Sequence, residues 1–140
     1  MKILTAVDGS SYSRRMLAYL AAHDEWLGAH HEYTLLHAVP AVPSRAAAVV
    51  DKAELKSYYD DEAEKVFKPL RGFFARQGLK ATFMSKVGPA AEVIAAAAAK
   101  GGFDLIMLGS HGHGSLVNLV MGSVATKVLA NTTTPVLLVR

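Results

Sequence analysis

The sequence predicts an α/β protein with one domain over residues 1–140, built on an open, doubly wound parallel sheet of five strands with four helices. The first reason is that short apolar runs alternate with stretches whose apolar residues recur every three or four positions, in the order βαβαβαβαβ. The second is composition: the chain is 51% hydrophobic but only 8% aromatic, as in sheets covered by Ala- and Leu-rich helices. The expected strands are 2–8, 32–39, 80–87, 103–109 and 135–140, and the expected helices are 12–29, 51–76, 88–102 and 123–131.

The first half of the chain contains two strand signals, two helix signals and a loop. The run KILTAVD at 2–8 ends in Gly-Ser-Ser, and residues 12–29 then show helical spacing. The strand EYTLLHAV at 32–39 is followed by two prolines in 40–50, which predict a surface loop without regular structure.

A long amphipathic helix is predicted for 51–76, because its apolar residues recur at helical intervals. Pro69 lies inside it and is expected to bend or split it. The acidic stretch 60–65 is interpreted as a solvated face of this helix.

In the second half, residues 80–87 alternate like a half-buried strand, and 88–102 resemble a helix that ends at a glycine pair. The continuous apolar run at 103–109 is typical of a strand buried on both faces. A short helix at 123–131 and a strand at 135–140 complete the alternation.

Composition argues against several classes of function. The net charge of +3 comes from 15 basic and 12 acidic residues that are scattered along the chain, whereas nucleic-acid binding needs a coherent basic stripe. Without cysteine there are no disulfides, thiolate zinc sites or cysteine nucleophiles, which fits a reducing compartment. We find neither a secretion signal nor a membrane span, and we therefore expect a cytoplasmic protein.

The segment GSHGHGSLVNLVMGS at 109–123 joins the end of one predicted strand to the start of a helix. In open α/β sheets ligands bind beyond the carboxyl ends of the strands, and the N–H groups at a helix start favour an anion. Its glycines would let the backbone approach a phosphate closely, and Ser123 would add a hydroxyl.

The start of a helix cannot hold a nucleotide alone. Its dipole stabilises a bound anion by about 0.3–1 kcal/mol, and at best by about 2 kcal/mol, whereas micromolar binding requires a binding free energy of about 8 kcal/mol. The rest of a nucleotide site must therefore come from other strand ends. Asp8 after the first strand could accept hydrogen bonds from ribose, and the backbone of Val39 at the end of the second could meet a base.

Two familiar phosphate motifs do not match this segment. The P-loop motif would require lysine where Ser115 stands, and it would follow an earlier strand. The dinucleotide motif G-x-G-x-x-G is missing its last glycine in GHGSLV at 112–117.

Gly109, Gly112, Gly122 and Ser123 form the pattern G-x2-G-x9-G-[ST]. With this spacing the chain resembles the universal stress protein family, in particular its ATP-binding subgroup, whose nucleotide signature has the same form. Five blocks also occur in the family's order: ILTAVDGS (3–10), LLHAVP (35–40), VGPAAEVIAAAA (87–98), DLIMLGSHGHG (104–114) and TPVLLV (134–139).

The resemblance implies a Rossmann-like sheet of strand order 3-2-1-4-5, similar to the adenine nucleotide alpha hydrolases, that binds ATP or another adenine nucleotide, with Mg²⁺ as an optional companion. It implies that Asp8 takes the ribose, that Ala6 and Val7 border the base, and that Val39 holds adenine through its backbone. It also implies a lining of ribose and phosphates by Leu108, Gly109, His111 and Gly112, and phosphate binding by Gly122, Ser123, Val124 and Ala125.

Simpler interpretations stay open for several of these residues. The glycine segment could be an ordinary loop in a relative that does not bind nucleotide, and Asp8 could be only a turn former. His111 and His113 are expected to be loop hydrogen-bonders rather than metal ligands, and no metal site is predicted. His23, His30 and His31 are expected at the surface.

The expected function is a regulatory switch in which ATP orders residues 110–121 and changes a surface seen by an unknown protein partner. Alternatives are a slow ATPase and a stress protein that acts through protein contacts without nucleotide. No catalytic residue is assigned. The strand Pro135–Arg140 is expected to pair with its copy in a homodimer, because an unpaired apolar edge favours aggregation.

Overall fold

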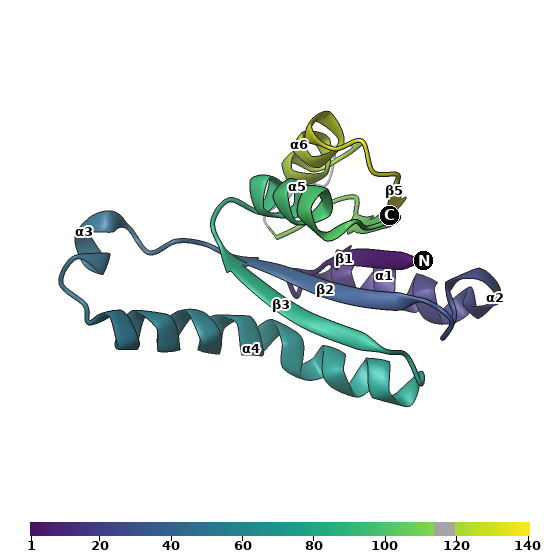
Figure 1. The fold of residues 1–140 in the computed structure, drawn as a ribbon, viewed down its shortest axis with the longest axis horizontal. Coiled ribbons are helices and arrows are strands. Elements are labelled where there is room, and N and C mark those ends of the chain that lie inside the picture. Colours follow the sequence, from purple (N-terminus) through teal and green to yellow (C-terminus); the bar gives the residue numbers. More distant parts are fainter. Residues whose placement is uncertain (114–119) are drawn as a thin grey trace.

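The computed structural model describes residues 1–113 and 120–140. It shows a parallel sheet with helices on both faces (Figure 1). The elements are β1 (Lys2–Ala6), α1 (Ser11–Ala22), α2 (Asp24–Leu27), β2 (Glu32–Val39), α3 (Ser44–Ala47), α4 (Lys52–Arg76), β3 (Ala81–Val87), α5 (Ala90–Gly101), β4 (Leu105–Gly109), α6 (Ser123–Asn131) and β5 (Val136–Val139).

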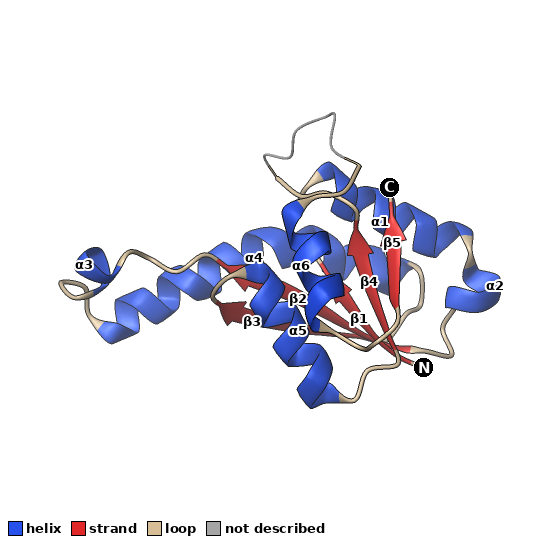
Figure 2. Cartoon of the chain, turned by 90° about the horizontal axis from the view of Figure 1, so that it is seen from above, coloured by secondary structure: helices blue, strands red, loops and turns tan. Residues whose placement is uncertain are grey.

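The sheet has the strand order β3-β2-β1-β4-β5, and all its pairings are parallel. This confirms the predicted fold class and the strand order that the resemblance implied. Leu4 of β1 pairs with Thr34 of β2 on one side and with Ile106 of β4 on the other. Chain order therefore reverses direction between β1 and β4, which brings the ends of these two strands together (Figure 2).

Successive side chains along each strand point to opposite faces of the sheet, so the interior consists of two hydrophobic cores, one on each face. Leu35 and Met107 face α1, α2 and α4, whereas their neighbours Leu36 and Ile106 face α5 and α6. All four side chains are at most 1% exposed. Strands buried on both faces explain the nearly continuous apolar runs in the sequence.

The described residues form six helices, and the prediction of four was wrong in two places. The predicted helix 12–29 ends at Ala22, and a separate turn, α2, follows because His23 has a non-helical backbone (φ −127°, ψ 46°). The predicted loop 40–50 contains the turn α3, which starts directly after Pro43. Such one-turn helices have no periodicity to detect.

α4 continues through Pro69 as a single helix, so the predicted split does not occur. The buried residues Ala63, Phe67, Leu70 and Phe74 form a stripe that extends on both sides of the proline. Packing of this stripe on the sheet holds both halves of the helix in place, although Pro69 cannot donate a helical hydrogen bond.

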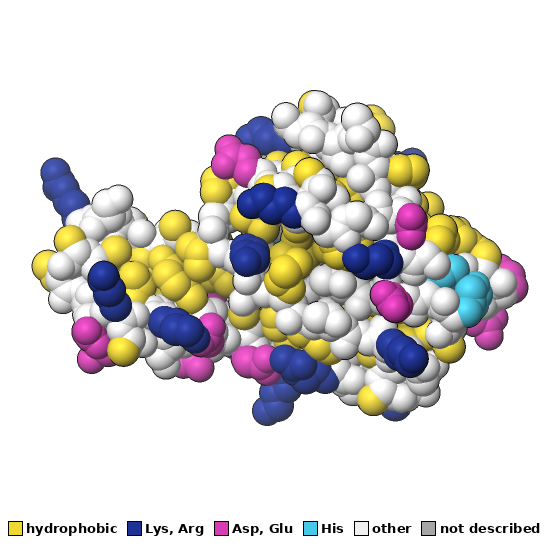
Figure 3. Space-filling view, in the orientation of Figure 1, with side chains coloured by type: hydrophobic (Ala, Val, Ile, Leu, Met, Phe, Trp, Pro, Cys, Tyr) yellow, Lys and Arg dark blue, Asp and Glu magenta, His cyan; other side chains and the backbone are white. Residues whose placement is uncertain are grey.

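α3 and the first turns of α4 extend past the carboxyl ends of β2 and β3 as an arm (Figures 1 and 2). Val49 in this arm is 86% exposed. On the face drawn in Figure 3, Lys and Arg side chains lie dispersed and interleaved with Asp and Glu. Within 1–113 and 120–140, no helix has the length and apolar character needed to cross a bilayer.

Candidate functional site

A cavity of about 510 Å³ opens where β1, β2 and β4 end, between α4 on one face of the sheet and α5 and α6 on the other. Ligand pockets in proteins usually have volumes of about 300–1,000 Å³. The position, at the reversal of chain order, is the one predicted from the sequence.

All but one of the twelve predicted site residues line this cavity. They are Ala6, Val7, Asp8, Leu108, Gly109, His111, Gly112, Gly122, Ser123, Val124 and Ala125. The structure therefore brings together groups that are more than a hundred residues apart in the chain. Their individual roles toward a ligand remain predictions.

Val39 is the exception. Its side chain is 2% exposed and packs in the core on the α4 side. Its carbonyl accepts a hydrogen bond of 3.0 Å from the Gly88 N–H, which ties β2 to the start of α5. The end of β2 lines the cavity through the neighbouring residues Ala38 and Pro40 instead.

Asp8 is held by a network at the start of α1. Its Oδ1 accepts hydrogen bonds of 2.9 Å from both the Ser10 N–H and the Ser13 hydroxyl, and its Oδ2 accepts a longer one from the His113 N–H. Burial raises the pKa of Asp8, but the hydrogen bonds from Ser10 and Ser13 and the nearby His113 outweigh burial, so the pKa lies below its ordinary 3.8. The carboxylate is therefore ionised at neutral pH and can accept hydrogen bonds.

Two glycines allow close packing around Asp8 and the end of β4. A Cβ atom on Gly112 would lie 2.7 Å from Asp8 Oδ2, and one on Gly109 would lie 3.0 Å from the Cβ of Tyr12. Neither glycine has a left-handed backbone, so space rather than conformation excludes a side chain. Gly9, with φ +78°, does need that conformation in the turn after β1.

The start of α6 faces the same cavity. Gly122 precedes the helix, offers no side chain to cap it, and is anchored by a 2.7 Å hydrogen bond from its N–H to the Ser110 carbonyl. Ser123 is exposed at the first helical position. Backbone N–H groups at such a helix start can hold an anion.

Three histidines line the cavity, and two of them bond backbone carbonyls that lie directly after β1. His37 Nδ1–H donates to the Val7 carbonyl, and His113 Nε2–H donates to the Asp8 carbonyl, each at 2.8 Å. His113 is thus a loop hydrogen-bonder, as expected. Among the residues that the structure describes, no group of three or more His, Asp or Glu side chains could hold a metal ion.

Sequence reasoning missed the contribution of α4 and α5. Glu62, Lys65 and Val66 form one wall, and Ala90 and Ile94 form another. Lys65 Nζ bonds Glu62 Oε1 at 2.5 Å, and this hydrogen bond and the Glu62 charge raise the pKa of Lys65. Nothing in the helical periodicity says which turn of a long helix reaches a cavity, so no sequence signal could have found them.

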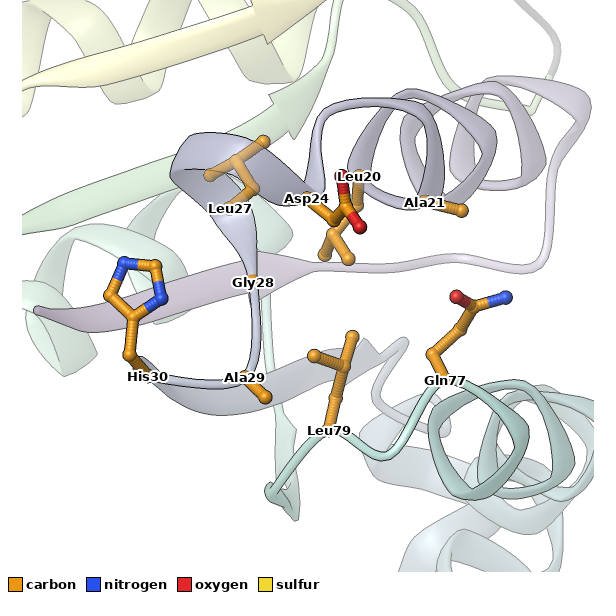
Figure 4. Close-up of a pocket in the computed structure, with 9 residues that line it drawn as sticks. All are labelled: Leu20, Ala21, Asp24, Leu27, Gly28, Ala29, His30, Gln77 and Leu79. Carbon is orange, nitrogen blue, oxygen red and sulfur yellow. The ribbon is translucent and has the colours of Figure 1, made fainter.

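A second, smaller cavity of about 200 Å³ lies near the amino ends of β2 and β3 (Figure 4). Leu20, Leu27 and Leu79 line it together with Asp24 and Gln77. It lies away from the strand ends where α/β proteins bind ligands.

Just before β2, His31 is buried, contrary to the prediction of a surface position. Its Nε2–H donates to the Trp26 carbonyl at 2.7 Å, and its Nδ1 accepts from the Met1 amino group at 2.8 Å, so both nitrogens of the buried ring are paired.

Comparison with known proteins places these features in a family. The model of the family described as "Universal stress protein family" matches residues 1–140. The chain is 33% identical over 138 residues to "Universal stress protein in QAH/OAS sulfhydrylase 3'region" of Thermus aquaticus, covering 99% of this chain and 97% of that protein. It is 31% identical over 153 residues to universal stress protein YxiE of Bacillus subtilis, covering 99% and 98%.

Solved structures share the fold. The structure of protein MJ0577, which shares its name with a universal stress protein of Methanocaldococcus jannaschii, superposes with a TM-score of 0.79 at 29% identity, covering 99% of this chain and 94% of that chain. A universal stress protein family protein from Arabidopsis thaliana with AMP bound has a TM-score of 0.71 at 14% identity, covering 99% and 90%. One from Archaeoglobus fulgidus in complex with dAMP has a TM-score of 0.70 at 18% identity, covering 100% and 98%. At such identities the last two likenesses show the fold alone.

Proposed function

Because the chain belongs to the universal stress protein family, we propose that it binds an adenine nucleotide, ATP in the first place, in the cavity at the ends of β1 and β4. The observation that carries this proposal is the convergence of Asp8, Gly109, Gly112 and the start of α6 on one cavity of about 510 Å³. AMP and dAMP in structures of the same fold support adenine as the base.

The residues present fit such a ligand. An ionised Asp8 accepts hydrogen bonds from ribose hydroxyls, and the apolar walls of Leu36, Ala38 and Ile94 suit a base. The phosphates meet N–H groups at the start of α6 and the Ser123 hydroxyl. Mg²⁺, where present, would accompany the phosphates and offset their charge.

The proposed role is to hold ATP rather than to cleave it rapidly. Fast hydrolysis requires a positioned water, metal-binding carboxylates and cations on the γ-phosphate. Among the described residues that line the cavity, the carboxylates are Asp8 and Glu62, and the latter already pairs with Lys65. Nucleotide that stays bound can act as a switch, because it stabilises the bound conformation and any partner surface formed by it.

The loop 110–121, which this switch would order, includes residues 114–119, and these lie outside the described part of the chain. In solution, binding of ATP should protect amides of 110–113 and 120–125 from hydrogen exchange. A second protein would recognise the ordered surface.

Two measurements test the function, and the second has a matched control. Mass spectrometry of small molecules released by denaturing the purified protein should detect an adenine nucleotide. Ser123→Ala should weaken ATP binding several-fold, because one phosphate hydrogen bond is lost. The matched variant Ser11→Ala removes the exposed serine at the first position of α1, outside the cavity, and should leave ATP binding unchanged.

Steady multiple turnover of ATP, abolished by substitution of Gly122, would contradict the holding role and favour an ATPase. A wild-type protein with no ligand, no thermal shift with ATP and no change in hydrogen exchange would favour a stress protein that acts through its surfaces alone.

A further inference from the structure

His111 lies between the cavity and α1, and a side chain of α1 packs against its ring. It lines the cavity, and its ring lies 4.9 Å from the ring of Tyr12, centroid to centroid, at an angle of 36°. The guanidinium of Arg15, one helical turn further, lies 4.9 Å from the centroid of the same Tyr12 ring. Tyr12 itself does not line the cavity.

The packing of Tyr12 depends on the end of β4. Gly109 leaves room for Tyr12, because a Cβ at Gly109 would lie 3.0 Å from the Tyr12 Cβ. Ser110, which is 3% exposed, places its hydroxyl 2.9 Å from His111 Nδ1. Tyr12 and Ser110 therefore fix the His111 ring from two sides.

Both contacts tolerate either charge state of the imidazole. A serine hydroxyl can donate to an unprotonated Nδ1 or accept from a protonated one. The face of an aromatic ring also attracts a cation. His111 can thus gain a proton without losing the neighbours that hold it.

Permanent positive charge is scarce around the cavity. Among the described residues that line the cavity, Lys65 is the one Lys or Arg, and its charge is paired with Glu62. Residues 114–119 have the sequence GSLVNL, without an ionisable side chain. The charged or titratable groups that face His111 or the same cavity are Asp8, Tyr12, Arg15, His37, Glu62, Lys65 and His113. A nucleotide with several phosphates therefore brings more negative charge than the fixed cations offset.

We propose that His111, held by Tyr12 as a positioning residue, supplies a proton-dependent positive charge to the phosphates, so that the protein prefers nucleotides with more phosphates as pH falls. This inference rests on the proposed nucleotide-binding function and names the residue that sets its phosphate preference. Histidine is the side chain whose charge ordinarily changes between pH 5 and 8. Nearby phosphate charge favours the protonated form, and linkage then makes protonation favour phosphate binding.

The test compares dissociation constants of ATP and adenosine for wild type and His111→Gln by calorimetry at pH 6, 7 and 8 and constant ionic strength. The ratio of the variant's constant to the wild-type constant cancels the titration of ATP itself. For ATP this ratio should rise several-fold from pH 8 to pH 6, because the wild-type protein gains a cation there that the variant lacks. For adenosine, which has no phosphate, it should stay constant.

Tyr12 is tested by two substitutions. Tyr12→Leu should reproduce much of the pH effect of His111→Gln on ATP binding, while its adenosine binding stays as in wild type. Tyr12→Phe keeps the ring and should bind ATP with the pH dependence of wild type. The matched control is His23→Gln. His23 stacks on Tyr19 at 4.0 Å in the same helix region, outside the cavity, and its loss should not change the pH profile.

Loss of the His111 effect and loss of nucleotide binding give different results in these experiments. If wild type binds ATP with a pH dependence equal to that of His111→Gln, the role of His111 is overturned while nucleotide binding stands. If only His111→Gln changes the profile and Tyr12→Leu does not, the positioning role of Tyr12 is overturned. If wild type binds neither ATP nor adenosine at any pH, both proposals fail.

Discussion

Among single residues, Gly112 is packed so closely against Asp8 that it leaves no room for a side chain. The hypothetical Cβ of Gly112 would lie 2.7 Å from Asp8 Oδ2, and the other oxygen of this carboxylate, Oδ1, is held by the Ser10 N–H and the Ser13 hydroxyl. Either Asp8 or the backbone of 111–113 would have to move. Asp8, which we propose for ribose binding, and the backbone of 111–113, which we propose for phosphate binding, are therefore packed so closely that neither can move without the other.

Gly112→Ala should therefore weaken ATP binding by at least about tenfold, or about 1.4 kcal/mol. Calorimetry with ATP measures this effect. The matched control is Gly72→Ala in α4, where the new Cβ would meet only the flexible end of Arg76 at 3.1 Å. That control should keep its ATP affinity and gain up to about 1 kcal/mol in unfolding free energy, because alanine favours a helix over glycine. Equal ATP affinity in Gly112→Ala and wild type would contradict the proposed packing.

At the scale of elements, Tyr33 connects β2 to the end of α2. Its side chain is 2% exposed, and its hydroxyl donates to the carbonyls of Leu27 and Gly28. Burial raises the pKa of Tyr33 to about 12. The folded protein thus keeps Tyr33 neutral at pH values where an unfolded chain has lost this proton.

Tyr33→Phe should lower the unfolding free energy by about 1–2 kcal/mol at neutral pH, because buried carbonyls lose their donor. In wild type, the stabilisation linked to the raised pKa is complete below pH 10.0 and is lost as pH rises toward about 12. The variant should lack this alkaline loss. Urea unfolding at pH values of about 8 and about 11 measures both effects.

Tyr58→Phe is the matched control, because Tyr58 is 48% exposed on α4. It should change stability little at either pH. A similar alkaline loss of stability in wild type and Tyr33→Phe would show that Tyr33 is not its source.

The comparison of prediction and structure is most informative for the elements. Strand positions were predictable because buried parallel strands require apolar runs of strand length, as at 103–109. The turns α2 and α3 were not, because a helix of four residues is too short to show a periodic pattern. The continuity of α4 through Pro69 depends on packing against the sheet, which the sequence of that helix alone does not reveal.

The same reasoning applies to the candidate site. Asp8, Gly109 and Gly122 could be placed near one another because parallel strands end at one edge of the sheet. Glu62 and Lys65 could not, because the tertiary position of α4 decides which of its turns reaches the cavity.

For the whole molecule, β5 is an edge strand that pairs only with β4 among the described residues. The carbonyl of Pro135 accepts a hydrogen bond from Ile106 of β4, and that of Val139 accepts one from Ser110, directly after β4. By alternation, Val136 and Leu138 direct their backbone groups away from β4. We expect these groups to pair with the same strand of a second copy in a twofold homodimer, as predicted for Pro135–Arg140.

Leu138→Pro should shift this dimer toward monomer, because proline removes an outward N–H without removing a hydrogen bond to β4. Light scattering coupled to size exclusion at micromolar concentration measures the mass. Circular dichroism checks that the variant keeps its fold. A wild-type protein that is monomeric at this concentration would contradict the proposed dimer.

Equilibrium dialysis of the wild-type protein with labelled ATP measures whether the cavity at the ends of β1 and β4 binds the nucleotide. We expect saturable binding of about one ATP per chain with micromolar or tighter affinity, which excess unlabelled ATP displaces. Equal concentrations of ATP on both sides of the membrane at millimolar ligand, with protein verified as folded, would contradict it.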